Sequence, residues 1–435
     1  MGTSEQLVGA GMSGRAAEDK ACLFARGWAA LGGVAGSEGS FGLYVPGRIE
    51  VLGKHTDYAG GRSLLCAAER GMCLVARPRP DNRVVVTDVA NGSRVETLLD
   101  SHTAANGAGW SVYVTTAARR LARNFPFARL GADIVFGSDL PAAAGMSSSS
   151  ALLTSIALAL IEVNALATSE TYRREIRSRE DLAEYLGTVE NGRDFRTLAG
   201  DAGVGTFGGS EDHTAMLCCR AGHLSQYSFC PVRREGEVAL PDGYEFVVGV
   251  SGVAAEKTGA ARTIYNQASL LAHRVLELWQ ARTGRTERSL AAAVGKWGLE
   301  EFAFLRAVEP ALADRFDQFC RETFEIIPAV VLALADGQVG EVGDLVDRSQ
   351  QEAERALGNQ VPETVFLARS ARQGGAVAAS AFGAGFGGSV WALVDSSEAA
   401  AFTRRWQAAY EAEFPARAAG AQFFRTLPGP AAMRL

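Results

Sequence analysis

The stretch "PGRIEVLGKHTDYAGG", residues 46–61, begins as an apolar strand and ends in a charged turn. Aliphatic residues predict a strand as far as Leu52. Lys54, His55 and Asp57 then fall within four positions, between glycines. A turn needs the glycines but not the ionisable groups, so the pattern indicates either a solvated surface turn or a binding loop that follows a buried strand.

Composition limits the classes of protein that this chain can be. Its 435 residues, 47% of them hydrophobic, suffice for two packed domains. A net charge of −6 argues against nucleic acid as a partner, although a small anionic substrate needs only local positive charge. Seven cysteines without a C-x-x-C pair predict reduced thiols. We find no signal peptide and no long uncharged apolar span, so we expect a cytoplasmic protein away from membranes, as a monomer or weak homo-oligomer.

Strand patterns dominate the first half of the chain and helical patterns the second, which indicates an α+β fold with two domains. We predict a flexible leader at 1–20, an N-terminal domain at 21–235 and a C-terminal domain at 236–435. The segment 214–229 is predicted to be a hairpin around Ala221-Gly222. Other predicted strands lie at 41–52, 72–76, 84–87, 132–138, 244–252, 376–383, 389–395 and 422–426; helices lie at 20–31, 110–125, 150–167, 178–190, 256–282 and 397–414.

A second stretch, "LPAAAGMSSSSALL" at 140–153, leads small residues and four serines into an apolar helix. Serine is favourable at a helix N-terminus, where backbone N–H groups lack partners. Those amides and the positive helix end can hold a phosphate, and a nearby hydroxyl can bind Mg²⁺. The stretch is not a Walker loop, because no GK[ST] follows. A plain serine-rich helix cap is the alternative.

A third stretch, "SAFGAGFGGSVWAL" at 380–393, contains G-x-G-x-x-G as Gly383, Gly385 and Gly388. A strand follows rather than a helix, so a dinucleotide-binding fold is not indicated. Closely spaced glycines are typical of a turn with positive φ or of close backbone approach.

Together, the three stretches resemble, in order and spacing, the three motifs of the GHMP kinase superfamily. The first is similar to the galactokinase signature G-R-V-N-L-I-G-E-H-T-D-Y-N-G-G. The resemblance implies the two-domain GHMP kinase fold, in which an N-terminal domain with a mixed sheet meets a C-terminal α/β sandwich-like domain at the active site. Further similar segments are "GWSVYV" (109–114), "VEN" (189–191), "GGSEDH" (208–213) and "YNQA" (265–268).

This resemblance implies a kinase that transfers the γ-phosphoryl group of ATP to the anomeric O1 of galactose or a related sugar. Asp212 matches the catalytic base and Arg48 the arginine that stabilises it. Ser149 and Glu190 match the Mg²⁺ ligands. Residues implied in sugar binding are Lys54, His55, Asp57, Gly209 and Tyr265. Those implied in ATP binding are Gly145, Met146, Ser147, Ser148, Ser149, Gly385 and Gly387, with Trp110 a candidate for the adenine pocket.

Several positions depart from the family pattern. Lys54 replaces a glutamate that bonds a sugar hydroxyl near C6, Glu50 replaces an asparagine and His213 a glutamine. An ammonium donates where a carboxylate accepts. Either the sugar carries an acidic or acceptor group there, or Lys54 pairs with Glu50 or Glu190 in an ordinary galactose pocket. The insert "GRDFRTLAGDAG" at 192–203 is either a lid or a longer loop.

Other functions stay open at this point. Within sugar kinases, the substrate could be galacturonate or glucuronate, L-arabinose or a heptose phosphate. A non-catalytic sugar sensor on the same fold would lose part of the serine motif or Asp212, and both are intact. The mevalonate and homoserine kinase branch lacks the H-T-D-Y segment that this chain carries.

Overall fold

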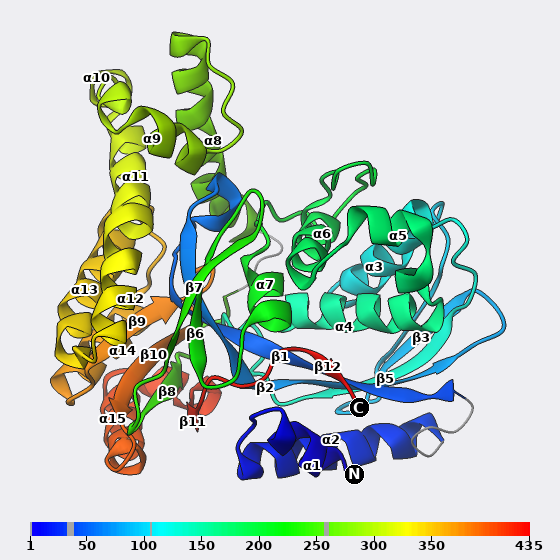
Figure 1. The fold of residues 1–435 in the computed structure, drawn as a ribbon. Helices are drawn as coiled ribbons and strands as arrows, with labels where there is room; N and C mark the ends of the chain where they lie inside the picture. The colour runs from blue at the N-terminus through cyan, green and yellow to red at the C-terminus, as the bar shows by residue number, and fades with distance from the viewer. Residues whose placement is uncertain (1, 33–38, 105–106, 256–260) are drawn as a thin grey trace.

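The computed structural model describes residues 2–32, 39–104, 107–255 and 261–435, and it leaves the side chains of 261–265 undescribed. Its described strands form an eight-stranded and a four-stranded sheet (Figure 1). Helices cover both sheets, so the architecture is the predicted α+β arrangement. The two ends of the described chain lie near each other, below the first sheet in Figure 1.

The first sheet has the order β12-β1-β2-β5-β3-β4, with β6 and β7 added at one end of β2. Its pairs are antiparallel except β3 with β5, so the sheet is mixed as predicted. The strands are β1 (Phe41–Leu52), β2 (Arg62–Pro78), β3 (Arg83–Asp88), β4 (Arg94–Leu98), β5 (Ala132–Ser138), β6 (His223–Ser228), β7 (Arg233–Ala239) and β12 (Met433–Arg434).

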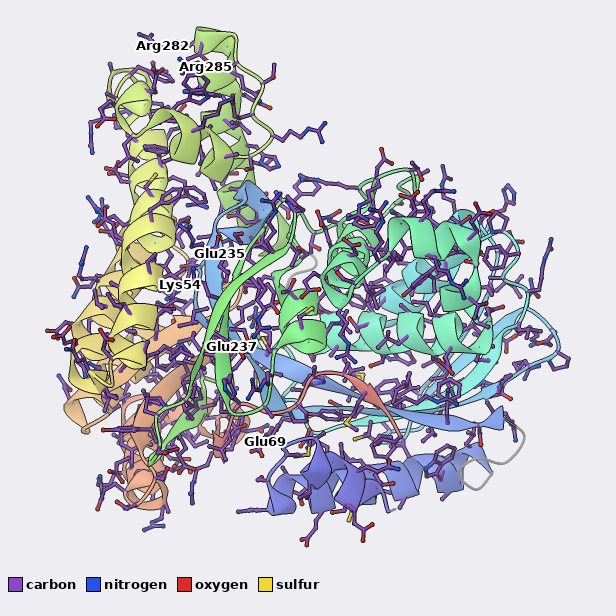
Figure 2. All side chains as sticks on the ribbon, viewed as in Figure 1. Lys54, Glu69, Glu235, Glu237, Arg282 and Arg285 are labelled. Carbon is purple, nitrogen blue, oxygen red and sulfur yellow. The ribbon has the colours of Figure 1, made fainter. Side chains whose placement is uncertain are left out.

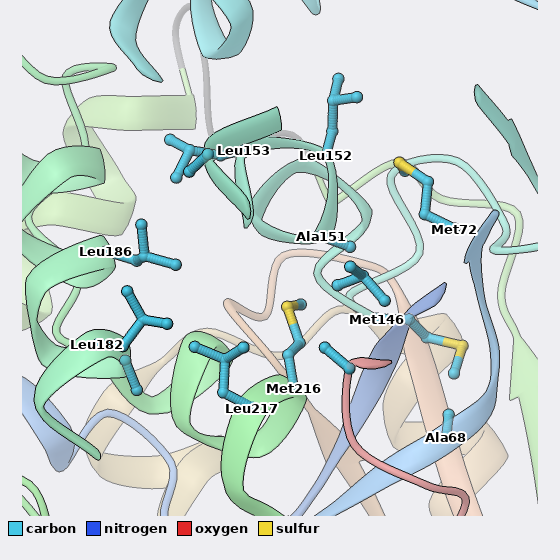
Figure 3. Close-up of a cluster of buried hydrophobic side chains, with 14 of the residues drawn as sticks. Ala68, Met72, Met146, Ala151, Leu152, Leu153, Leu182, Leu186, Met216 and Leu217 are labelled. Carbon is cyan, nitrogen blue, oxygen red and sulfur yellow. The ribbon is translucent and has the colours of Figure 1, made fainter. Parts of the chain in front are cut away.

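One face of this sheet is covered by helices that enclose the main core, with α4 at its centre. α4 is apolar almost all round, and its side chains contact both the sheet and the neighbouring helices (Figure 3). Such a helix is stable only when it is enclosed on all sides. The covering helices are α3 (Ser111–Asn124), α4 (Ser148–Val163), α5 (Glu170–Glu175), α6 (Arg179–Asn191) and α7 (Glu211–Cys218).

The opposite face is covered by the N-terminal segment that we predicted to be a flexible leader. Residues 3–20 instead lie in α1 (Thr3–Gly9) and α2 (Gly14–Leu31). Leu7, Met12 and Ala17 are buried in a cluster with residues of β1, β2 and β5. The prediction missed this packing because the segment's few apolar residues are widely spaced, and only the sheet beneath them shows that they share a face.

The second sheet has the order β11-β8-β10-β9, with all pairs antiparallel. α14 and α15 pack on one face and α12 and α13 on the other, which matches the predicted sandwich-like domain. These elements are β8 (Tyr244–Val250), β9 (Ala378–Phe382), β10 (Ser389–Asp395), β11 (Gln422–Thr426), α12 (Ile327–Ala335), α13 (Val339–Glu352), α14 (Pro362–Gln373) and α15 (Ala399–Glu413).

A helical arm extends beyond the second sheet, at the top left of Figure 1. It has its own aromatic cluster, which includes Trp279, Phe302 and Phe316. Tyr58 and Ala59 of the opening stretch are buried in the same cluster, so the arm holds the end of that stretch. The arm comprises α8 (Ala261–Thr283), α9 (Leu290–Trp297), α10 (Leu305–Val308) and α11 (Pro310–Cys320).

The chain passes from one sheet to the other between Ala239 and Tyr244, close to the boundary proposed near residue 235. The C-terminal segment is not confined to the second domain, because β12 returns to pair with β1. The predicted hairpin at 214–229 is wrong in its first half. Residues 211–218 form α7, whose apolar side chains pack beside α4 and α6.

All seven cysteines are free, as predicted, although Cys22 and Cys230 are exposed. Within the described ranges, no helix combines the length and apolar character needed to cross a membrane.

The burial of the N-terminal helices can be tested by truncating Leu7, which is fully buried. We expect Leu7→Ala to lower the free energy of unfolding by about 2–5 kcal/mol, because it leaves a cavity against the sheet. Val8→Ala is the matched control, since Val8 is 47% exposed in the same helix. Urea denaturation midpoints measure both, and equal effects of the two substitutions would contradict this packing.

Candidate functional site

The three sequence motifs meet around one pocket, which is lined by residues of the first motif and of the glycine turn, while the serine turn contacts Arg48 and Asp212. The Gly383 N–H donates to Glu50 Oε2 at 3.3 Å, and His55 Nε2 lies 3.1 Å from the Ala384 carbonyl. Ser389 Oγ donates to the Ala144 carbonyl at 2.6 Å, which joins the glycine turn to the serine turn. The pocket has an empty volume of about 530 Å³ and opens to solvent. It is lined by Arg48, Glu50, His55, Asp57, Tyr58, Glu190, Asn191, Thr206, Gly208, Gly209, Glu211, Asp212, His213, Gly383 and Ala384.

Arg48 and Asp212, the predicted catalytic pair, are in direct contact. Arg48 Nε lies 2.8 Å from Asp212 Oδ1, and the guanidinium also donates to the Gly145 carbonyl. Ser150 Oγ donates to Asp212 Oδ2 at 3.1 Å. β1 changes register on either side of Arg48 and Glu50, and such irregularities re-aim side chains near functional sites. The carboxylate is therefore oriented from β1 and from α4.

The loop after β1 places His55 and Asp57 at the pocket wall. His55 has φ of 58°, and its Nδ1 lies 3.1 Å from Tyr58 Oη, which accepts a hydrogen bond from Arg315. Asp57 Oδ2 accepts the Glu211 N–H at 3.2 Å, at the start of α7. The predicted Gly209 lies so close that a Cβ there would be 2.5 Å from this oxygen. Only glycine fits at position 209, where the loop after β1 packs closely against the start of α7.

Lys54 lies where the loop after β1 meets the C-terminal helices (Figure 2). Its Nζ donates to Ser349 Oγ at 3.0 Å, and that hydroxyl donates to Glu322 Oε1 at 3.0 Å. Glu322 Oε1 also accepts the Gly53 N–H at 2.8 Å. A buried ammonium needs such partners, because an unpaired buried charge is costly. Lys54 is therefore not among the described residues that line the pocket.

The serine turn contributes to the site mainly through the carbonyl of Gly145 and through the hydroxyl of Ser150, its last serine. Gly145 and Ser147 have positive φ, and Met146 is buried in the core (Figure 3). Ser148 and Ser149 are half-buried in the first turn of α4. Ser147 Oγ is buried and has no hydrogen-bond partner among the described residues. A buried hydroxyl of this kind suits a ligand that the protein alone does not supply.

His213 orients Glu190, the predicted metal ligand. Its Nε2 lies 3.1 Å from Glu190 Oε2, and its Nδ1 lies 2.9 Å from Thr154 Oγ1 of α4. The described residues contain no cluster of three or more His, Cys, Asp or Glu side chains suited to a metal. A cation held by Ser149 and Glu190 would take its other ligands from phosphate and water, which is how Mg²⁺ usually binds. The residues present therefore fit Mg²⁺ that accompanies a nucleotide.

Besides Lys54 and the serine turn, four predicted ligand residues lie away from the pocket lining or outside the description. Trp110 packs edge-on against Phe136, with ring centroids 5.6 Å apart. A Cβ at Gly385 would be 2.3 Å from a backbone oxygen of Asn359, and one at Gly387 would be 2.6 Å from that of Val253. These two glycines allow close backbone packing. The side chain of Tyr265 lies outside the described residues.

The insert at 192–203 packs against α3 and α6. Arg119 Nε donates to Asp201 Oδ2 at 2.6 Å, and Asn124 Nδ2 donates to the Ala199 carbonyl at 3.0 Å. Phe195 and Leu198 are both buried. Of the two alternatives, these contacts favour a longer packed loop over a lid.

Sequence reasoning missed four residues of the site. Glu211 and Ser150 stand next to recognised motif residues, so their position in the sequence was a usable signal. Tyr58 belongs to the H-T-D-Y segment itself. Arg315 reaches His55 from α11, with Nη2 donating to the His55 carbonyl at 2.6 Å, and no pattern around it indicates this contact.

The pocket is strongly acidic. Five carboxyl groups line it, and Arg48 is the one side chain with a permanent positive charge among its described lining residues. Burial raises the pKa of Glu50 to about 7, against the lowering effects of Arg48 and Lys54. Burial also raises the pKa of Glu211 well above its ordinary value, helped by the charge of Glu50. Glu50 and Glu211 therefore keep their protons to a higher pH than an ordinary surface glutamate does.

This burial predicts a pH dependence of stability. A carboxyl whose pKa rises from 4.5 in the unfolded chain to about 7 in the folded protein stabilises the fold most below pH 4.5. That stability is lost as the pH rises through 7, by an amount on the order of 3 kcal/mol. Besides Glu211, the charged groups that act on Glu50 are Arg48, Lys54 and Glu322.

We expect the urea midpoint to fall between about pH 5 and pH 8, and Glu50→Gln to flatten this fall. Glu277→Gln is the control, since Glu277 is 65% exposed. Identical slopes for the wild-type protein and Glu50→Gln would contradict the burial effect.

Comparisons with known proteins agree with the geometry. The galactokinase galactose-binding signature matches residues 34–78, the GHMP kinase N-terminal domain matches 112–209 and the GHMP kinase C-terminal domain matches 330–412. The chain is 26% identical to the galactokinase of Exiguobacterium sibiricum over 398 residues, which cover 87% of this chain and 90% of that protein. It is 27% identical to the galactokinase of Roseiflexus sp. over 377 residues, covering 84% and 86%.

The fold is also similar to solved structures. Lactococcus lactis galactokinase complexed with galactose superposes with a TM-score of 0.72 at 22% identity, covering 91% of this chain and 95% of that one. A D-glycero-D-manno-heptose 1-phosphate kinase superposes less well, with a TM-score of 0.55 at 13% identity, covering 91% and 98%. The galactose-binding signature, both kinase domains and the convergence of the three motifs show that this chain belongs to the galactokinase family of the GHMP kinase superfamily.

Proposed function

We propose that this protein transfers the γ-phosphoryl group of ATP to the anomeric O1 of galactose or a closely related neutral sugar, giving a sugar 1-phosphate. The observation that carries this proposal is the contact between Arg48 Nε and Asp212 Oδ1, 2.8 Å, in a pocket lined by residues of the first motif and of the glycine turn, with the serine turn bonded to both members of the pair. Phosphoryl transfer needs a positioned hydroxyl, a proton acceptor and compensation of charge, and this pair can supply the last two.

In the proposed reaction, Asp212 accepts the proton of O1 as that oxygen attacks the γ-phosphorus. Arg48 forms an ion pair with one oxygen of the carboxylate and Ser150 donates a hydrogen bond to the other, so they orient it and stabilise its negative charge. His55 and Asp57 would hold hydroxyls of the sugar from the opposite loop. Because Asp212 and the sugar hydroxyl would be held in position together, the base and the hydroxyl would not need to meet by diffusion.

The serine turn would bind the phosphates of ATP. Its support is the start of α4 at Ser148, together with the unpartnered hydroxyl of Ser147. We further propose that Ser149 and Glu190 hold Mg²⁺. Bound there, the ion would offset the negative charge of the phosphates during transfer.

The charge of the pocket favours a neutral sugar over a uronate. Asp57, Glu190 and Asp212 line it besides the pair of Glu50 and Glu211, and these carboxylates would repel the carboxylate of a uronate. The interpretation that Lys54 recognises an acidic group loses its support, because Lys54 bonds Ser349 instead. L-Arabinose and a heptose derivative are neutral at the ring and stay as alternatives within the same reaction.

An ATP-coupled assay over galactose, galacturonate, glucuronate, L-arabinose and galactosamine tests the function. We expect turnover with galactose, and we expect Asp212→Asn to lower kcat about 10²- to 10⁴-fold, because the proton acceptor is lost. Binding of ATP, measured by calorimetry, should be retained. Asp242→Asn is the control, because Asp242 is exposed. Near-normal turnover in Asp212→Asn, or no ADP release with any sugar, would overturn the assignment.

A further inference from the structure

Two carboxyl side chains that the proposed chemistry does not use meet in the pocket wall. Glu50 comes from β1 and Glu211 from the first turn of α7, and both are more than nine-tenths buried. Glu211 Oε2 accepts a hydrogen bond from Ser63 Oγ at 2.6 Å, and Glu50 Oε2 accepts the Gly383 N–H at 3.3 Å. Each carboxyl group is therefore held in place by a neighbouring residue of the protein.

The other oxygen of Glu50, Oε1, has no hydrogen-bond donor beside it among the described residues. Glu211 can bond Glu50 only when one of the two groups carries a proton. Arg48 neutralises the pair only in part, because it lies 3.9 Å from Glu50 and 3.7 Å from Glu211 while it contacts Asp212 at 2.8 Å. The pocket wall thus holds a buried oxygen that lacks a donor.

A hydroxyl group is the ligand that fits this pair. A hydroxyl both donates and accepts one hydrogen bond, and a carboxyl beside a carboxylate offers both functions. A ligand carboxylate would place a second negative group beside the charged member of the pair. Position 54, where the family pattern has a glutamate for a sugar hydroxyl, cannot serve here, since Lys54 is bonded to Ser349.

We propose that Glu50 and Glu211 form the hydroxyl-recognising wall of the sugar site in this protein and that Lys54 has a purely structural role. The specificity for a neutral sugar then arises from β1 and α7 rather than from the loop residue 54. This inference rests on the proposed function, because it assigns specificity to the same pocket.

The test measures kcat/KM for galactose and for each of its monodeoxy derivatives. We expect the kcat/KM of the wild-type protein to be about 10- to 100-fold lower for at least one derivative than for galactose. A decrease of this size corresponds to the loss of one hydrogen bond to a charged group. Glu50→Met or Glu211→Met removes the oxygens at similar volume, and we expect either to abolish that rejection. Lys54→Met is the matched control and should keep the ratio.

The ratio of kcat/KM for galactose to that for a deoxy derivative does not depend on the folded fraction of a variant. It can therefore be compared even when a substitution lowers stability. Ser63→Ala serves as a milder variant, because it removes only the hydroxyl that holds Glu211, and it should shift the same ratio in the same direction. If the wild-type protein phosphorylates galactose but both Met variants keep its discrimination, or if Lys54→Met changes it, this inference is wrong. If the wild-type protein phosphorylates no sugar, the proposed function itself fails.

Discussion

The buried guanidinium of Arg48 is the constraint on which the site depends. It leaves β1 between two register shifts and contacts both the Gly145 carbonyl and the Asp212 carboxylate. A buried charge that loses its partner costs about 3–5 kcal/mol, so these three segments cannot separate without a large penalty. β1, the serine turn and the start of α7 are therefore fixed relative to one another. That arrangement places a proton acceptor beside the turn proposed to hold phosphates.

The remaining charges explain why the pocket suits hydroxyl groups. One guanidinium is shared among Asp212, Glu50 and Glu211, and its shortest contact is with Asp212. The two glutamates are left with burial as the dominant influence, which raises the pKa of both. Lys54 acts on Glu50 only from outside the pocket, through its charge. The same electrostatics thus leave Asp212 paired with a cation and favour protonation of the two glutamates nearby.

Much of this arrangement could be predicted from the sequence, because the motifs are local. The serine turn and the pair of Arg48 and Asp212 follow from short patterns in a fixed order. Lys54 could not be placed in this way, since its partner Ser349 is 295 residues away on α13, and no pattern around Ser349 indicates this contact. Helix α7 was mistaken for a strand because the apolar run before Cys219 fits both periods at that length.

The position of the transferred phosphate tests the central claim most directly. After incubation with ATP, Mg²⁺ and galactose, the product can be examined by phosphorus and proton NMR. Because Asp212 is assigned to deprotonate O1, the account predicts a phosphorus nucleus coupled to the anomeric proton. Phosphate on any other sugar oxygen, or release of inorganic phosphate alone, would contradict it.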